Sequence, residues 1–200
     1  RREWHHAAES NGASAGLGVD AEGVFAVLAG TASSFSHGGT RRWGIDWYDG
    51  APAPVVEGGR LYLGDSAGVA AVSTAGRSLW RHVPEGVQLP YSWVVAPPAG
   101  GDRVFLGNSE GVSALSVATG ERLWNVSLPE TATSPARLDE GTVVVGCRDG
   151  SIRAVSVADG TERWRSDAFS DVLAAPVARD GVVYVAGADG TVSAVADGTV

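Results

Sequence analysis

Short apolar segments alternate with glycine-containing turns along the whole chain. Residues 152–157, Ile-Arg-Ala-Val-Ser-Val, place every second side chain on one face, which is the period of a β-strand. Residues 142–145, Thr-Val-Val-Val, are all β-branched, which is typical of a strand buried on both faces. Asp149-Gly150 separates the two segments, and glycine supplies the positive φ angle of a tight hairpin. No segment shows a helical apolar stripe, so we predict an all-β protein.

The arrangement repeats, and the repeat is the strongest signal in the sequence. Its period is marked by Trp4, Trp43, Trp80, Trp124 and Trp164, with spacings of 39, 37, 44 and 40 residues. Gly39, Gly76, Gly120 and Gly160 each precede one of the last four tryptophans by four positions. The clearest repeat contains strands at about 132–138, 142–147, 151–157 and 161–166. Four antiparallel strands in roughly 40 residues are typical of one blade of a β-propeller.

We therefore expect a single β-propeller domain over residues 1–200, with five blades' worth of strands. An outer strand at 1–6 precedes whole blades at about 14–45, 52–82, 92–126 and 132–166 and a partial blade at 172–200. The terminal strand and the partial blade could join in a closed five-bladed ring, or the chain could be an arc of a larger wheel. Methionine is absent even at position 1, which favours the arc and a piece of a longer protein.

The last two strands of each repeat carry a recognisable motif, roughly Ala-x-Asp-x-x-Thr-Gly-x-x-x-Trp. Ala114, Thr119, Gly120 and Trp124 match it, with Ser116 where Asp is usual. The repeat at about 132–166 keeps Ala154, Gly160 and Trp164. The repeat at about 52–82 keeps Ala70, Gly76 and Trp80, and the repeat at about 14–45 keeps only Gly39 and Trp43. The motif resembles the tryptophan-docking motif of PQQ-like quinoprotein β-propellers. That family includes quinoprotein alcohol dehydrogenases and BamB-like outer-membrane assembly lipoproteins.

Each repeat tryptophan is expected to join its blade to the next one. A tryptophan buries roughly 150–250 Å² and can donate a hydrogen bond through its indole N–H. On an outer strand it can lie over the next blade's turn, where glycine lets the backbone approach the ring. We call Trp4, Trp43, Trp80, Trp124, Trp164, Gly39, Gly76, Gly120 and Gly160 the docking set.

Trp47 and Trp93 lie outside this register. Trp93 and Tyr91 fall at the start of an inner strand, an end that usually faces the central channel of a propeller. The long loop at about 82–92 precedes them. We therefore expect Tyr91 and Trp93 to belong to an interaction surface.

Composition excludes several classes of partner. The chain has 23 acidic and 15 basic residues, a net charge of −8, and every base is arginine. Without a basic run, binding to nucleic acid or to an anionic membrane is disfavoured. No apolar run approaches the roughly 18 residues that span a bilayer. The lysine-free, acid-rich composition resembles that of haloarchaeal or other high-GC proteins, whose acidic surface keeps them soluble in strong salt.

Two Gly-x-Ser-x-Gly stretches, at 64–68 and 107–111, suggest a hydrolase only superficially. A nucleophile elbow needs a strand, a sharp turn and a helix, whereas both stretches fall at hairpins of the repeat. His5, His6, His37 and His82 are read as surface or strand-end residues. Neighbouring histidines on a strand point to opposite faces and chelate poorly. We therefore assign no catalytic and no metal-binding residue.

Cys147 is the one cysteine of the chain, so no intrachain disulfide can form, and we expect a buried or rim thiol. Asn125-Val126-Ser127 matches an N-glycosylation sequon, which matters only in an extracytoplasmic setting.

The resemblance implies two classes of function. Its enzymes use PQQ, a calcium site, a general-base aspartate and, commonly, adjacent cysteines, and none of these can be assigned here. We expect no cofactor in this chain, while PQQ and calcium stay open for a longer parent. The leading hypothesis is a non-enzymatic, BamB-like scaffold that binds a protein partner outside the cytoplasmic membrane. A fragment of a PQQ- and calcium-dependent dehydrogenase and an extracytoplasmic sensor domain are the alternatives.

Overall fold

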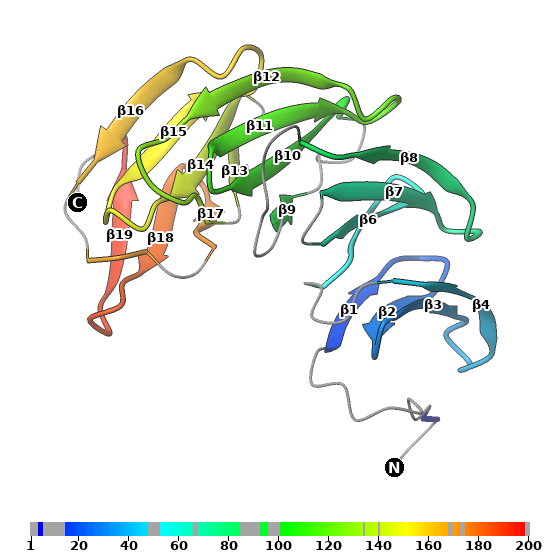
Figure 1. The fold of residues 1–200 in the computed structure, drawn as a ribbon. Helices are drawn as coiled ribbons and strands as arrows, with labels where there is room; N and C mark the ends of the chain where they lie inside the picture. The colour runs from blue at the N-terminus through cyan, green and yellow to red at the C-terminus, as the bar shows by residue number, and fades with distance from the viewer. Residues whose placement is uncertain are drawn as a thin grey trace. The chain divides into compact units, whose positions relative to one another are not determined.

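The computed structural model describes residues 4–5, 15–47, 53–65, 68–84, 93–95, 101–133, 135–139, 141–167, 170–172 and 175–198. In these ranges the chain forms β-strands and no helix (Figure 1). The strands make five antiparallel sheets in chain order, here called blades 1 to 5. The all-β fold of four-stranded blades predicted from the repeat is confirmed. The described ranges therefore contain no helix that is long and apolar enough to cross a membrane.

Each sheet is a meander in which neighbouring strands are consecutive in sequence. Blade 1 contains β1 (Ala15–Val19), β2 (Val24–Leu28), β3 (Thr31–Phe35) and β4 (Arg41–Asp46). Blade 2 contains β5 (Val55–Glu57), β6 (Arg60–Gly64), β7 (Val69–Ser73) and β8 (Ser78–His82). Blade 3 contains β9 (Trp93–Val95), β10 (Arg103–Asn108), β11 (Gly111–Ser116) and β12 (Arg122–Ser127). Blade 4 contains β13 (Ala136–Asp139), β14 (Thr142–Gly146), β15 (Ile152–Ser156) and β16 (Glu162–Ser166). Blade 5 contains β17 (Val177–Arg179), β18 (Val182–Ala186) and β19 (Val192–Ala196).

Several hairpins close through two consecutive residues with positive φ. The pairs Ala29-Gly30, Gly58-Gly59 and Asp180-Gly181 all adopt this conformation. Two positive φ angles define the type I′ turn, whose twist matches that of the flanking strands. The glycine-rich turns of the sequence therefore act locally, by joining adjacent strands.

Two compact units result from the contacts within the chain, residues 1–92 with 98–100 and residues 93–97 with 101–200. The first unit holds blades 1 and 2, whose facing sides are apolar. Blade 1 contributes Phe25, Val27 and Ala32 to this core, and blade 2 contributes Leu61, Leu63 and Val72. Burial of these side chains is the main stabilisation of the first unit.

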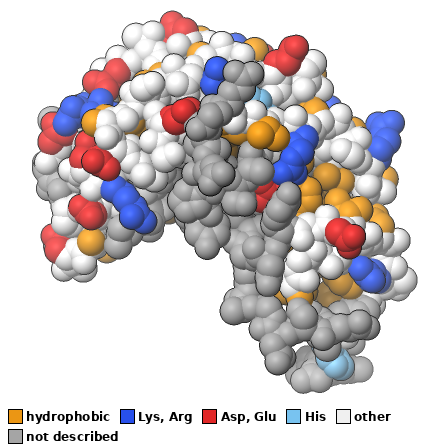
Figure 2. All heavy atoms as spheres, in the orientation of Figure 1, with side chains coloured by type: hydrophobic (Ala, Val, Ile, Leu, Met, Phe, Trp, Pro, Cys, Tyr) orange, Lys and Arg blue, Asp and Glu red, His pale blue; other side chains and the backbone are white. Residues whose placement is uncertain are grey.

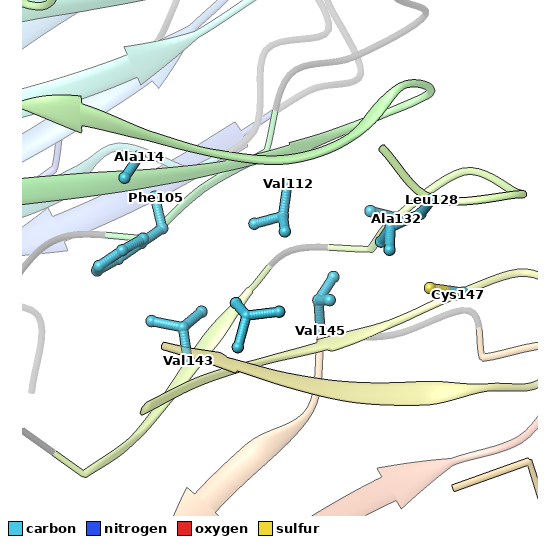
Figure 3. Close-up of a cluster of buried hydrophobic side chains, with 9 residues drawn as sticks. Phe105, Val112, Ala114, Leu128, Ala132, Val143, Val145 and Cys147 are labelled. Atoms are coloured by element: carbon cyan, nitrogen blue, oxygen red, sulfur yellow. The ribbon is translucent and has the colours of Figure 1, made fainter. Parts of the chain in front are cut away.

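The second unit holds blades 3, 4 and 5 around two apolar cores. In the core between blades 3 and 4, Phe105 and Val112 point toward Val143 and Val145 (Figure 3). Val144, the residue between those two valines, belongs instead to the core shared with Val183, Val185 and Val195 of blade 5. Successive side chains of β14 thus enter opposite cores, which explains the run of β-branched residues at 142–145.

The first strand of blade 4 is shorter than the sequence predicts. We expect a strand at about 132–138, whereas β13 begins at Ala136, directly after Pro135. Proline has no N–H to donate to a sheet, so it interrupts the ladder. Ala132 forms an isolated bridge with Cys147 ahead of it. Of the outer strand predicted at 1–6, only residues 4–5 are described, and they are not in a strand.

Candidate functional site: the tryptophan contacts between blades

The tryptophans of four blades occupy the same position in their sheets. Trp43, Trp80, Trp124 and Trp164 are the third residues of β4, β8, β12 and β16. Each lies across from a small residue of the preceding strand, namely Ser34, Ala71, Ala114 and Ala154. The register shifts directly after that small residue in all four sheets. A bulge bends the outer strand at this point, and a small neighbour leaves room for an indole.

In the first unit, Trp43 of blade 1 contacts a turn of blade 2. Its indole N–H donates a hydrogen bond of 2.8 Å to the carbonyl oxygen of Thr74. A Cβ atom added to Gly76 would lie 2.9 Å from the ring. The ring also packs on Phe25, with centroids 6.2 Å apart. One tryptophan thus contacts both its own sheet and the next.

Trp4 makes the same contact with blade 1. Its indole N–H donates a hydrogen bond of 2.9 Å to the carbonyl oxygen of His37. Its ring stacks on that of Phe35, with the ring centroids 6.0 Å apart. A Cβ atom on Gly39 would come within 2.6 Å of the indole. Gly39 has a φ of 86°, so both its backbone conformation and the close approach favour glycine.

The second unit repeats the geometry between blades 3 and 4. The indole N–H of Trp124 donates to the carbonyl oxygen of Val157 at 3.0 Å, and an added Cβ on Gly160 would lie 2.9 Å from the ring. Between blades 4 and 5 a Cβ on Gly198 would lie 3.3 Å from the Cβ of Trp164. Gly198 is therefore the counterpart of Gly160 in blade 5.

Trp80 is buried in the first unit, with its ring 6.1 Å from that of Tyr62. Burial raises the pKa of the Tyr62 hydroxyl. The expected partner of Trp80, Gly120, belongs to the second unit, so that pairing stays a prediction.

A cluster of Trp47, Arg81 and Asp65 in the first unit is not predicted from the sequence. The Arg81 guanidinium lies 5.4 Å from the centre of the Trp47 ring and donates to the Asp65 carboxylate at 2.7 Å. The other carboxylate oxygen of Asp65 accepts the N–H of Gly68 at 3.0 Å. The Asp65 side chain is fully buried, so Arg81 balances a buried charge. The only sequence signal for the cluster is an arginine directly after a docking tryptophan.

The candidate interaction residues are only partly placed. Tyr91 lies outside the described residues. The backbone of Trp93 opens β9 and pairs with Gly107 of β10. Their role stays a prediction.

The hydrolase-like stretches coincide with hairpins. Ser109 is exposed in the turn between β10 and β11, and the Asn108 side chain accepts the N–H groups of Glu110 and Gly111. Ser66 of the other stretch lies outside the described residues.

The described histidines are near the surface: His5 and His37 are exposed, and His82 is half-buried. His6 is not described. In the part of the chain that the structure describes, no group of three or more His, Cys, Asp or Glu could hold a metal ion.

Cys147 is fully buried at the end of the core between blades 3 and 4 (Figure 3). Burial raises the pKa of its thiol and outweighs the opposing effects of Ser151 and Arg153. The thiol is therefore protonated and shielded at neutral pH. Asn125 of the sequon is exposed on β12, and its carbonyl oxygen accepts a 2.7 Å hydrogen bond from the Ser113 hydroxyl.

The visible surface carries acidic and basic side chains interspersed rather than separated by sign (Figure 2). Several large apolar side chains are exposed on individual blades. They include Leu17 and Val19 of blade 1, Leu123 of blade 3, and Val177, Tyr184 and Val192 of blade 5.

Comparisons with known proteins agree with this architecture. The family model for the outer membrane protein assembly factor BamB matches residues 1–138 and 109–200. A curated BamB of Xanthomonas campestris pv. campestris is 35% identical over 68 residues, covering 29% of this chain and 17% of that protein.

Solved structures share the fold. The BamB structure from Moraxella catarrhalis has a TM-score of 0.72 and 22% identity, over 89% of this chain and 59% of that one. The computationally designed Ika8 protein has a TM-score of 0.74 and 22% identity, over 89% of this chain and 56% of that one. This chain thus spans less than two thirds of the length of these BamB proteins. The repeat, the blades and the family match together show that the chain belongs to the family of the outer membrane protein assembly factor BamB.

Proposed function

We propose that this chain is a non-enzymatic scaffold that binds a protein partner, as expected for a BamB-like propeller. The observation that carries the proposal is the family match, which extends over the whole chain. The curated relative is itself named as an assembly factor for outer membrane proteins.

The architecture suits such a role because the blades are held firmly together. Apolar cores join blades 1 and 2 in the first unit and blades 3, 4 and 5 in the second. We propose that the docking set reinforces these junctions, since Trp43 and Trp124 each bond to the next blade. Loops carried on a rigid scaffold are where proteins of this kind place their binding residues.

The proposed contact surface contains Tyr91 and Trp93. Both are aromatic residues beside a long loop that includes Pro84 and Pro90. Aromatic side chains offer large contact area together with a polar group, and they are enriched in protein interfaces. A protein partner accounts for two such residues only two positions apart in the sequence.

We propose that the chain works without PQQ or calcium. The dehydrogenase alternative commonly relies on adjacent cysteines, and Cys147 is the one cysteine in this sequence. Its thiol is buried in an apolar core, where it supports packing. We also propose an extracytoplasmic location, by analogy with the outer membrane role in the relatives' name.

Calorimetric titration with PQQ, with and without calcium, tests the cofactor-free scaffold. The scaffold hypothesis predicts that only heats of dilution are measured, with and without calcium and at low and high salt. Saturable binding that requires calcium would favour the dehydrogenase, and the next step would then be dye-linked alcohol oxidation. A protein with a size and net charge similar to those of this chain serves as the control for non-specific heats.

A further inference from the structure

Asp-Gly pairs recur in the turns of this chain, at 49–50, 149–150, 159–160, 180–181, 189–190 and 197–198. In such a pair the amide nitrogen of the glycine can attack the carboxyl carbon of the aspartate, because glycine has no side chain that hinders the approach. Hydrogen bonds that hold the carboxylate or the amide oppose this reaction, since they must break before the two groups can meet. The described pairs differ in these hydrogen bonds.

In three of the pairs both reacting groups are held. The glycine N–H groups of 149–150, 159–160 and 189–190 each donate to a backbone carbonyl oxygen, at 3.1, 2.9 and 3.1 Å. Each aspartate carboxylate accepts the N–H of the residue after its glycine, at 2.8, 3.1 and 3.0 Å. Asp189 also accepts the hydroxyl of Thr191 at 2.7 Å. The hydrogen bonds from Thr191 lower the pKa of Asp189, which keeps its carboxyl group ionised and less open to attack.

Asp180-Gly181, the turn between β17 and β18, lacks these restraints. Among the described residues the Gly181 N–H donates to no backbone carbonyl, and the Asp180 carboxylate contacts only the Arg179 guanidinium, at 3.4 Å. That ion pair is 83% and 90% exposed, so it restrains the carboxylate little. An added Cβ on Gly181 or on Gly190 meets no atom within 4 Å. The pairs at 180–181 and 189–190 are thus equally open and differ in their hydrogen bonds.

The exposure of this turn is a property of its place in a blade. In blade 1 the corresponding turn exposes Ala21 and Glu22, although blade 2 packs on that blade. In blade 4, Asp139 beside the corresponding turn is exposed, although blade 5 packs on that blade. The first hairpin of a blade therefore stays open to water when a neighbouring blade is in place.

We propose that Asp180-Gly181 is a site of spontaneous isoaspartate formation. The Gly181 amide nitrogen bonds to Cγ of Asp180 and loses its proton, while the C–OH bond of the protonated carboxyl group breaks and its oxygen leaves as water. The resulting succinimide takes up one water molecule. Addition at Cγ restores aspartate, whereas addition at the α-carbonyl carbon leaves the main chain running through Cβ and Cγ. No enzyme or cofactor takes part, so this inference does not depend on the proposed scaffold function.

The product changes the hairpin that contains it. Isoaspartate lengthens the backbone of the turn by one methylene group. The two-residue turn fixes the register of β17 and β18, in which Arg179 pairs with Val182 and Val177 with Tyr184. A longer connection no longer fits this register, so the modified chain should hold β17 less firmly against β18.

Prolonged incubation of the folded 200-residue chain at neutral pH is the test. Electron-transfer fragmentation of the digested chain distinguishes isoaspartate from aspartate at each Asp-Gly pair. We expect at least about tenfold more isoaspartate at Asp180 than at Asp189, because three hydrogen bonds must break first at Asp189-Gly190. The same chain unfolded in urea is the control. There these hydrogen bonds are lost, and the two positions should convert at similar rates.

Two variants sharpen the comparison without disturbing the turns. Thr191→Val removes the hydroxyl that bonds to Asp189, so isoaspartate should increase at Asp189 and stay unchanged at Asp180. Asp180→Asn keeps the turn, since Asn-Gly is a preferred type I′ sequence, and its conversion releases ammonia, which changes the mass of the intact chain. Equal isoaspartate at Asp180 and Asp189 in the folded chain would overturn the proposal. So would conversion of Asp180 in urea but not in the folded chain, because the hairpin would then protect it.

Discussion

The ring of Trp43 lies so close to the backbone of Gly76 that a Cβ atom added to this glycine would come within 2.9 Å of it. Gly76 also has a φ of 85°, in the left-handed region. Two independent requirements therefore select glycine at this turn, one from the backbone and one from the tryptophan of the preceding blade. Because Gly39 and Gly160 combine the same two features, the relationship belongs to the repeat.

Gly76→Ala should destabilise the first unit more than Gly58→Ala does. Both glycines have positive φ angles, so alanine costs about 1–2 kcal/mol at either position. An added Cβ at Gly58 meets no atom within 4 Å, whereas at Gly76 it displaces the Trp43 ring. Urea denaturation, monitored by tryptophan fluorescence, measures the difference in unfolding free energy between the two variants. Equal losses of unfolding free energy in the two variants would show that the ring contact is unimportant.

Trp43 variants separate the indole hydrogen bond from the packing of the ring. Trp43→Phe keeps an aromatic ring but removes the N–H that bonds to Thr74, and it should cost about 1 kcal/mol. Trp43→Ala also removes the packing on Phe25 and should cost about 3 kcal/mol. Circular dichroism during thermal unfolding reports both changes. The control is Leu123→Ala, at an exposed site, whose free energy of unfolding should stay within about 0.5 kcal/mol of that of the parent chain.

The Asp65–Arg81 pair should show strong coupling in a double-mutant cycle. Arg81→Met keeps an aliphatic chain near Trp47 but leaves a buried carboxylate without its guanidinium. Because the Arg81 side chain is a third exposed, we expect a loss of about 2 kcal/mol rather than the full cost of a buried pair. Asp65→Asn in the same chain removes the buried charge and should restore part of the loss. Additive effects of the two substitutions would contradict this account.

Burial of Cys147 predicts a loss of stability at alkaline pH. Its pKa is raised in the folded chain, so the thiol stabilises the fold fully below its unfolded pKa of about 8.5. That contribution is lost as the pH rises toward the folded pKa, by at most about 1.4 kcal/mol per pH unit. The unfolding free energy of the parent chain should therefore fall more steeply above this pH than that of Cys147→Ala. Parallel pH profiles would mean that the thiol is not protected in the native state.

The blades could be predicted from the sequence because their signals are local and repeated. The strand predicted at about 142–147 is observed as β14, Thr142–Gly146, because β-branched residues are buried on both of its faces. The start of β13 was not predictable to the same accuracy, since the repeat does not show how Pro135 breaks the ladder. The spacing of the glycines and tryptophans predicts the contacts that the structure shows for Trp43 and Trp124.

The Asp65, Arg81 and Trp47 cluster escaped sequence analysis because it depends on folding rather than on spacing. Trp47 follows β4 in a connection whose length varies between repeats, so no register relates it to Asp65. Asp65 could equally have been a simple turn residue, and only its burial beside Arg81 distinguishes the two. For the interaction surface, the sequence offers aromatic residues but no partner, and Tyr91 lies outside the described residues.

Photo-crosslinking in the cell that produces this protein tests the scaffold most directly. A benzophenone amino acid replaces Tyr91 or Trp93 in turn, and Leu123 in a third variant serves as the exposed control position. The account predicts a discrete adduct with one protein species at position 91 or 93, and none at position 123. No protein adduct at positions 91 and 93, together with calcium-dependent binding of PQQ to the same preparation, would contradict it.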